Sequence, residues 1–555
     1  MFAALPEPTI DRSAARVSLP PASPLRATSG REPLLKARAL FRRRGRGALP
    51  LVLASVAVVG GLAFALFALG NWHAPPEDRD GIIVYCAAGV RPAVAPVAEA
   101  FEKELGTKVE IRSGSSGALE AQIRASVGLR PGDLYIPAAA DPFVERNRLG
   151  SAVAAASGKT PFLKEVLPLA RFRLVLAVTP GKEDRISEFA DLADQDVAVL
   201  IANDEAAVGK KTKEVLTAAG VWDTIRGKAR QLQTVTELAG AIKLGTNADA
   251  GFMWDATARQ FGLTIVELPE LAGEPSTISA AVLADAANPT GALRFARYLA
   301  APDKGQASFR ELHYETVAGD PWAEVPEVVL YSGSVNRPAI AETIVEFEAR
   351  EGCRVIPTYD GCGALVATMR AGQKPDAYFA CDISFMAMVE DEFDEKLDLS
   401  NTEMVILVRK GNPRNIRSLE DLAGDDMAVG LADEKLSALG RLTVNLLDEH
   451  GLREPVVKNR KASSPSAHYL VIQMAQSEKL DAAIVYRANC AEVREQLDIV
   501  AIDHPRANAK QPFAVHHEAQ YPQLTQRLRD ALTSEESRAR FENSGFRWNL
   551  GANVE

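Results

Sequence analysis

The sequence is poor in the residue types that most often carry chemistry. Its 555 residues include seven histidines and five cysteines. The cysteines are too few and too scattered for a fold that depends on a disulfide framework, and the histidines are not spaced with carboxylates as metal ligands are. A nucleophile elbow and a phosphate-binding loop are also missing. We therefore expect a protein that is not an enzyme and that needs no cofactor.

Charge is missing from one long stretch near the N-terminus. Residues 49–69 contain no charged side chain and directly follow a basic cluster at residues 42–46. The stretch is about long enough to cross a bilayer, and basic residues tend to stay on the cytoplasmic side. We expect residues 48–70 to be a single-pass anchor in the cytoplasmic membrane, with the rest of the chain in the periplasm. A cleaved signal peptide is the competing interpretation.

Residues 1–47 have little apolar periodicity and are rich in Pro, Ala and Arg, which predicts a disordered cytoplasmic tail. They carry ten Lys or Arg and three Asp or Glu, a formal charge of +7. Because the whole chain carries −10, the remainder carries −17. Phosphate binding needs the opposite surface charge, so this acidic exported region argues against nucleic acid as a partner.

The exported region contains a long internal repeat at an offset of 246 residues. The segment "RSGSSGALEAQI" (residues 112–123) aligns with "TYDGCGALVATM" (residues 358–369), and the preceding Tyr85 and Phe101 align with Tyr331 and Phe347. The repeat divides the region into two copies, which we place at residues 80–325 and 326–555.

Each copy begins with a strand, a tight turn and a helix. This unit occurs a second time and is followed by a third strand. Alternating β and α units of this kind predict a mostly parallel sheet that is covered on both faces. Each copy is large for one core, and its element order suggests two α/β lobes between which the chain crosses. A cleft between lobes is a common ligand site.

Six motifs of the first copy, in order, resemble one family: the type II periplasmic solute-binding proteins, specifically the molybdate and tungstate binders of ABC importers. They are "VYCAAGVRPAV" (84–94), "GSSGALEAQI" (114–123), "GDLYIPAAAD" (132–141), "AAVGKKTKEVLTAAGVWD" (206–223), "ADAGFMW" (248–254) and "NPTGALRFARYLAAPDKGQASFRELHY" (288–314). The resemblance implies two tandem domains, each of two α/β lobes with a cleft between, and an ABC transporter permease as partner.

That family holds a tetrahedral oxyanion through serine hydroxyls and through backbone amides at helix N-termini, where the helix dipole favours an anion. The resemblance assigns the anion site of the first copy to Ala88, Gly89, Arg91, Ser115, Ser116, Ala138, Val208, Val235 and Trp254.

Three of these residues depart from the family pattern. Gly89 replaces the usual first serine, Trp254 replaces a tyrosine, and Arg91 is new. An arginine in the first turn of a helix opposes the dipole. Arg91 therefore either meets an anion that neutralises its charge and the positive end of the helix dipole, or is a surface residue that lies over the strand ends.

The second copy departs further. Cys362 stands at the position of Ser116, Asp360 at that of Gly114 and Cys381 at that of Ala138. A carboxylate and two thiolates would repel a dianion, so we expect this cleft to bind something else or nothing. The ligand-binding residues that the resemblance assigns here are Ser334, Val335, Arg337, Cys362, Cys381 and Tyr486.

Three interpretations remain open for Cys362 and Cys381. They are small buried side chains, a disulfide favoured by the oxidising location, or a site for a soft metal or a thiol reagent. Cys362 follows the second predicted strand and Cys381 the third. If those strands are neighbours in a parallel sheet, their ends lie about 5 Å apart.

The sequence therefore predicts a membrane-anchored extracytoplasmic binding protein that captures a molybdate-like or tungstate-like oxyanion for an ABC transporter. Two alternatives belong to other classes. One is a transmembrane receptor that senses a solute, and the other is a metal-cation binder that uses the second copy.

Overall fold

The computed structural model describes residues 81–126, 132–139, 143–194, 196–245 and 247–550. These residues belong to one compact unit that spans Pro76–Glu555. The predicted basic tail at 1–47 and the predicted anchor at 48–70 lie outside the described residues. Among the described helices, none has the length and apolar character that a membrane span requires. We use domain 1 for residues 81–325 and domain 2 for residues 326–550.

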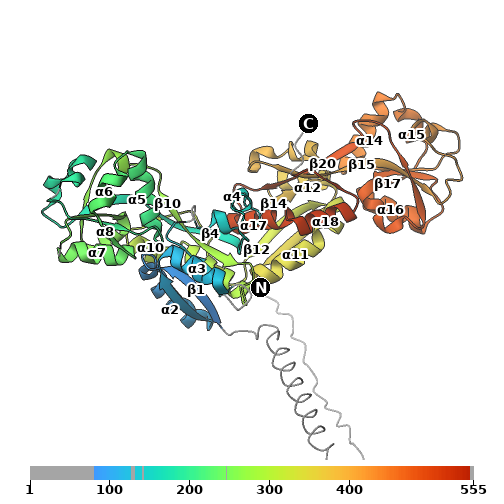
Figure 1. Cartoon of the computed structure of the whole chain (residues 1–555). Coiled ribbons are helices and arrows are strands. Elements are labelled where there is room, and N and C mark those ends of the chain that lie inside the picture. Colours follow the sequence, from blue (N-terminus) through green and yellow to red (C-terminus); the bar gives the residue numbers. More distant parts are fainter. Residues whose placement is uncertain (1–80, 127–131, 140–142, 195, 246, 551–555) are drawn as a thin grey trace, which may run out of the picture. The chain divides into compact units, whose positions relative to one another are not determined.

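Domain 1 contains two sheets, each with its own helices (Figure 1). The first sheet has the order β11(Glu315–Thr316), β4(Leu163–Phe172), β10(Ser276–Leu283), β3(Leu134–Ile136), β1(Gly81–Ala87), β2(Lys108–Gly114). The second has the order β7(Arg230–Leu232), β6(Val199–Ala202), β8(Ala250–Trp254), β5(Leu174–Val178), β9(Thr264–Val266). The α-helices are α2(Arg91–Leu105), α3(Ser116–Ser126), α4(Ala152–Ala156), α5(Ala207–Ala218), α6(Trp222–Lys228), α7(Val235–Leu244), α8(Asp255–Phe261), α9(Pro289–Ala300) and α10(Gln306–Glu311).

Domain 2 repeats this plan with one continuous path of strands. The order is β13(Arg354–Asp360), β12(Glu327–Gly333), β14(Ala377–Phe379), β20(Asn508–Val515), β15(Leu397–Arg409), β18(Ala482–Tyr486), β16(Val429–Ala432), β17(Arg460–Ser464), with β19(Leu497–Ala501) and β21(Arg547–Trp548) also paired to β15. The first part of β15 pairs with β20 and its last part with β18, so this strand joins the two lobes. The α-helices are α11(Arg337–Glu351), α12(Cys362–Arg370), α13(Ile383–Met386), α14(Ala438–Glu449), α15(Arg453–Lys458), α16(Ala467–Gln476), α17(Pro522–Leu532) and α18(Glu535–Asn543).

The prediction of a mostly parallel sheet holds for only part of each domain. In the first sheet of domain 1, β1 pairs in parallel with β2 and β3, whereas β10 pairs antiparallel with β3 and β4. The cause is the crossing between lobes. The chain leaves the first lobe through β4 and returns from the second lobe through β10, so the two connecting strands run in opposite directions.

The same local interactions shape the first helix of both domains. Pro92 and Pro338 lie in the first turn, where a missing N–H costs nothing. Each helix ends at a left-handed glycine. The side chain of Glu102 accepts a hydrogen bond from Val109 N at 2.6 Å. In domain 2 the corresponding bond joins Glu348 to the amide of residue 355 at 2.7 Å. The repeat therefore conserves geometry as well as residue pattern.

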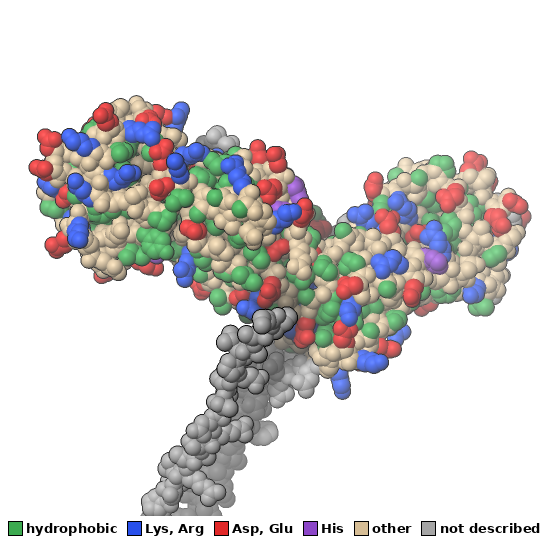
Figure 2. Space-filling view, turned by 180° about the vertical axis from the view of Figure 1, so that it is seen from behind, with side chains coloured by type: hydrophobic (Ala, Val, Ile, Leu, Met, Phe, Trp, Pro, Cys, Tyr) green, Lys and Arg blue, Asp and Glu red, His purple; other side chains and the backbone are tan. Residues whose placement is uncertain are grey.

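The surface mixes both charge signs. On the face in Figure 2, acidic and basic side chains lie interspersed over the described residues. This face lacks the continuous basic patch that nucleic-acid binding needs.

Candidate functional site

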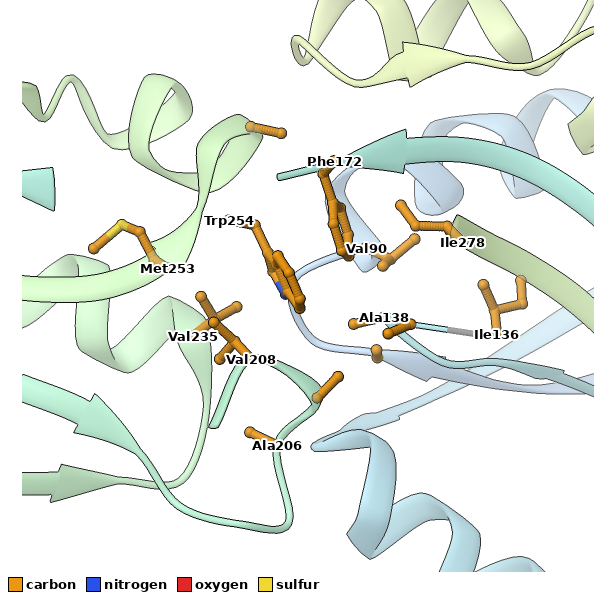
Figure 3. Close-up of a cluster of buried hydrophobic side chains, with 14 of the residues drawn as sticks. Val90, Ile136, Ala138, Phe172, Ala206, Val208, Val235, Met253, Trp254 and Ile278 are labelled. Carbon is orange, nitrogen blue, oxygen red and sulfur yellow. The ribbon is translucent and has the colours of Figure 1, made fainter. Parts of the chain in front are cut away.

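A small pocket lies between the two lobes of domain 1. Its walls come from the ends of β1 and β2 and from α3 on one side, and from the starts of α5 and α7 and the end of β8 on the other. The lining residues are Ala87, Ala88, Gly89, Gly114, Ser115, Ser116, Ala138, Ala206, Ala207, Val208, Thr234, Val235 and Trp254. Figure 3 shows Trp254, Val208 and Val235 facing Ala138 across this space.

None of the lining residues carries a charge. The polar side chains among them are two serines, one threonine and the indole of Trp254. Hydroxyls can donate or accept hydrogen bonds, whereas an indole N–H can only donate. The pocket can therefore supply donors to a ligand and offers it no carboxylate.

Ser116 is the most constrained of these side chains. It is 2% exposed, and its Oγ accepts a hydrogen bond from Ala138 N at 3.1 Å. The hydroxyl of Tyr135 donates to the Ser116 carbonyl at 2.7 Å, which fixes the first residue of α3. A hydroxyl that accepts one hydrogen bond still has its own hydrogen to donate. In this arrangement the Ala138 amide serves Ser116, and the Ser116 O–H is the donor available to a ligand.

Three helices begin at the pocket. Their first residues are Ser116 in α3, Ala207 in α5 and Val235 in α7. Thr234 caps α7 by accepting a hydrogen bond from Glu237 N at 3.2 Å, whereas Ala206 has no side chain that could cap α5. The first amides of a helix lack intrahelical partners and lie at the positive end of its dipole. The start of α5 is thus the least satisfied helix N-terminus in the pocket and the one best suited to an anion.

Trp254 supplies a buried donor. Its side chain is 1% exposed and stacks on Phe172 with ring centroids 4.0 Å apart. Within the described part of the chain, its Nε1 has no hydrogen-bond partner. Buried polar atoms in native proteins are nearly always paired. An unpaired indole N–H in the wall of a pocket is available to donate a hydrogen bond to a ligand.

Gly89 lines the pocket, whereas Arg91 lies outside it. A Cβ atom at Gly89 would lie 2.7 Å from Val235 Cγ1, so the serine that the family usually has there would collide with this wall. Arg91 is exposed in the first turn of α2 and is not a lining residue. Its position is that of a surface arginine near the strand ends.

The turn at residues 114–117 also joins the two lobes. Gly117 N donates to the carbonyl of Glu205 at 2.7 Å, and that carbonyl lies in the loop after β6 in the other lobe. A Cβ atom at Gly117 would lie 2.7 Å from the same oxygen. In domain 2, Gly363 N donates in the same way to Leu436 O at 3.0 Å. Both glycines permit a close contact between lobes.

Of the nine residues predicted for domain 1, eight line one pocket, and Arg91 does not. The lining residues that were not assigned to the site from the sequence are Ala87, Gly114, Ala206, Ala207 and Thr234. Thr234 had a detectable signal, because Thr followed by Glu three residues later forms a capping box at the start of α7.

The corresponding position in domain 2 is filled by a disulfide between Cys362 and Cys381, with Cα atoms 6.4 Å apart. Cys381 N donates to Cys362 Sγ at 3.0 Å, as Ala138 N does to Ser116 Oγ. A Cβ atom at Gly333 would lie 2.2 Å from Cys381 Sγ, so the sulfurs pack directly against the end of β12. Among the three interpretations, the structure has the disulfide, and neither sulfur is available as a thiolate ligand.

The other residues predicted for domain 2 come from three different elements. Ser334 and Val335 lie in the short 3-10 helix Ser334–Asn336 after β12. Tyr486 is 2% exposed at the end of β18, and its hydroxyl has no partner within the described residues. Arg337 is exposed, with its guanidinium 5.4 Å from the centroid of the Tyr359 ring.

The remaining three cysteines, Cys86, Cys353 and Cys490, are free and buried. Burial raises the pKa of Cys353 and of Cys490 to about 12. At neutral pH these thiols stay protonated and are poor nucleophiles and metal ligands.

Comparison with known proteins identifies one matching family and several relatives. The family model of the bacterial extracellular solute-binding proteins matches residues 82–315 and again residues 328–547. A Haemophilus influenzae protein whose name describes it as a binding protein is 20% identical over 229 residues, which are 40% of this chain and 91% of the relative. YvgL of Bacillus subtilis, named as a substrate-binding lipoprotein of an ABC transporter, is 25% identical over 183 residues, which are 33% of this chain and 65% of the relative.

Two solved structures are among those that match this chain. The sulfate-binding protein SubI of Mycobacterium tuberculosis H37Rv is 18% identical with a TM-score of 0.37, covering 41% of this chain and 88% of SubI. The periplasmic molybdate-binding protein of Azotobacter vinelandii is 23% identical with a TM-score of 0.35, covering 43% of this chain and 100% of that protein. On the two family matches, this chain belongs to the bacterial extracellular solute-binding proteins and contains the family's domain twice.

Proposed function

We propose that domain 1 binds a small tetrahedral oxyanion of the molybdate or tungstate kind and that the protein delivers it to the permease of an ABC transporter. The observation that carries the proposal is the chemistry of the pocket between the lobes. It is uncharged, and Ser116 and Trp254 supply it with buried hydrogen-bond donors.

Neutral donors suit an anion better than a cation. Metal cations such as Mg²⁺, Ca²⁺ and Zn²⁺ are held by carboxylate, imidazole or thiolate groups, and none of these lines the pocket. A dianion instead gains from several hydrogen bonds and from the dipoles of helices that point their N-termini at it. The lining residues also include no pair of titratable groups that could act as acid and base.

Transport rather than catalysis follows from the family and from the relatives. YvgL is named as part of an ABC transporter. The motifs of domain 1 resemble the molybdate and tungstate binders, which is the reason for proposing this kind of anion. We further propose that residues 48–70 anchor the protein to the cytoplasmic membrane with both domains in the periplasm. Among the described residues, nothing favours the receptor or the metal-cation alternative.

The proposal is tested by isothermal titration calorimetry of the full-length protein in detergent against molybdate, tungstate, sulfate, phosphate and Zn²⁺. We expect saturable binding of at least one tetrahedral dianion, with molybdate or tungstate the tightest. Saturable binding of Zn²⁺ together with no response to any of the four anions would contradict it.

A further inference from the structure

Domain 2 has a second hollow outside the position of its disulfide. This feature, here called the rim groove, lies along α12 and is closed at its sides by α13 and by the start of α14. Its volume is about 580 Å³. A volume of this size is typical of sites for organic ligands.

Three cationic side chains line the rim groove: Arg370, Lys435 and Arg441. The lining contains no Asp or Glu. Across the part of the chain that the structure describes, none of the three cations is recorded in an ion pair. Arg370 donates to the carbonyl of Met388 at 3.1 Å, which holds its guanidinium at the groove without neutralising it.

At the corresponding place in domain 1, a carboxylate offsets part of the positive charge. Glu120 there forms ion pairs with Arg124 and Arg146. Burial alone would raise the pKa of Glu120, but the hydrogen bond and charge of Arg146 lower it below the ordinary value, so this carboxylate stays ionised. Lys210 completes the cluster, with its Nζ 4.5 Å from the centroid of the Phe143 ring.

Domain 2 keeps two of the three cations of this cluster and loses its carboxylate. At the repeat offset, Arg370 corresponds to Arg124, and Val366 corresponds to Glu120. Arg441 is the fourth residue of α14, as Lys210 is of α5. The positive charge of the groove therefore lacks the internal counter-ion that domain 1 provides.

The floor of the rim groove is apolar. Val366 and Phe385 form its buried base, with the guanidinium of Arg441 5.7 Å from the centroid of the Phe385 ring. The apolar side chains that are exposed or partly exposed at the groove are those of Ala367, Ala371 and Met388. A ligand that matches both features has an anionic group for the cations and an apolar part for Ala367, Ala371 and Met388. An inorganic oxyanion would leave the apolar floor unused.

We propose that the rim groove of domain 2 binds an organic anion that joins a carboxylate or phosphate group to an aromatic or aliphatic part. The disulfide between Cys362 and Cys381 fills the inner position, so this ligand lies outside it, along α12. The proposal is independent of the anion proposed for domain 1.

Phenyl phosphate is a suitable probe because it combines a dianion with one ring. The full-length protein in detergent is saturated with molybdate and then titrated calorimetrically with phenyl phosphate, inorganic phosphate or phenol. We expect saturable binding of phenyl phosphate only. Arg441→Gln should raise the Kd about tenfold, a loss of about 1.4 kcal/mol. The matched control is Lys210→Gln, at the same helix position in domain 1, which should leave the Kd unchanged.

A second variant, Val366→Glu, places the missing carboxylate in the groove and should also weaken binding. Circular dichroism melting establishes that each variant is folded. The proposal is overturned if phenyl phosphate does not saturate, if phenol binds equally well, or if Lys210→Gln weakens binding as much as Arg441→Gln.

Discussion

At the scale of single residues, the two domains place different chemistry in the same geometry. Ser116 Oγ and Cys362 Sγ each accept a hydrogen bond from a backbone amide at the end of the third strand, at 3.1 Å and 3.0 Å. In domain 1 the hydroxyl keeps a hydrogen to donate. In domain 2 the sulfur is bonded to Cys381 and donates nothing. Two changes of residue type, Cys362 at the position of Ser116 and Cys381 at that of Ala138, thus separate a position with a free hydroxyl donor from one that is closed.

Ser116→Ala should weaken anion binding in domain 1 by about 1.5 to 3 kcal/mol, the range for a hydrogen bond to a charged group. The fold should be little affected, because alanine suits the first turn of a helix. Calorimetry with molybdate measures the change. Ser115→Ala is the comparison and should weaken binding less, because Ser115 Oγ also accepts from Ala118 N, at 3.4 Å. Equal affinities for wild type and Ser116→Ala would remove this hydroxyl from the site.

Trp254→Phe removes the unpaired indole N–H and keeps an aromatic ring to stack on Phe172. We expect the affinity for molybdate to fall by about 1 kcal/mol or more, the scale of one hydrogen bond. Trp222→Phe is the matched control, because Trp222 starts α6 and does not line the pocket. If both variants bind like wild type, the indole does not contact the anion.

At the scale of elements, each domain holds its two lobes together through the start of one helix. Gly117 at the start of α3 donates to Glu205 O, and Gly363 at the start of α12 donates to Leu436 O. Neither glycine has room for a side chain, since a Cβ atom would lie 2.7 Å and 2.1 Å from a backbone oxygen of the other lobe. The glycine that the repeat keeps in both copies is therefore explained by contact between lobes.

Gly117→Ala should hold the lobes of domain 1 apart and weaken molybdate binding about tenfold, because closure of the lobes around the ligand becomes costly. The measurement is calorimetry, with small-angle scattering to report compactness. Gly227→Ala is the matched control: it also lies in a helix, and a Cβ atom there would meet nothing within 4 Å. A Gly117→Ala protein with unchanged affinity would show that this contact has no part in binding.

The sequence predicts the repeated strands and helices well, and it predicts the antiparallel strands β10 and β20 poorly. Tyr85 and Tyr331 lie in strands of the same length because the local pattern of apolar residues is the same in both copies. The antiparallel return through β10 and β20 depends on how the chain crosses between lobes, which no local pattern reports. The disulfide is a similar case. Cys362 and Cys381 follow β13 and β14, which are separated by β12 rather than adjacent.

The disulfide forms across β12 because that strand ends in Gly333, where a side chain would collide with Cys381 Sγ. The sequence left this pairing as one of three alternatives. The start of α3 was predictable because the family motif contains Ser116 itself. The contact of Gly117 with the other lobe was not predictable, because Glu205 takes part through its backbone carbonyl, which any residue could supply.

At the scale of the whole molecule, the two domains meet at a buried cluster of charge. Arg297 of α9 in domain 1 and Arg527 of α17 in domain 2 both bond to Glu351 at the end of α11, at 3.2 Å and 2.6 Å. Glu351 is 2% exposed. Burial alone would raise its pKa, but the charges and hydrogen bonds of Arg527 and Arg297 lower it below the ordinary value.

Glu351→Gln should destabilise the protein by about 3 kcal/mol or more, because it leaves buried arginines without their counter-ion. The lowered pKa means that the ionised carboxylate contributes above the unfolded pKa of about 4.3 and that this contribution is lost as pH falls through the folded value. The difference from wild type should therefore shrink in acid. Thermal melting from neutral to acidic pH measures it. Glu346→Gln is the control, because Glu346 pairs with Arg540 and its side chain is 58% exposed.

Equal melting temperatures for wild type and Glu351→Gln at neutral pH would contradict a stabilising role for this cluster. So would a difference that grows as the pH falls.

The central claim is that the family's domain occurs twice and that only domain 1 keeps the anion site. The most direct test is the stoichiometry of molybdate binding by the full-length protein without reductant, measured by calorimetry for wild type, Ser116→Ala and Cys362→Ala. We predict one molybdate per chain, with binding weakened by Ser116→Ala and unchanged by Cys362→Ala. Two molybdate ions per chain, or binding that survives Ser116→Ala and is lost in Cys362→Ala, would contradict it.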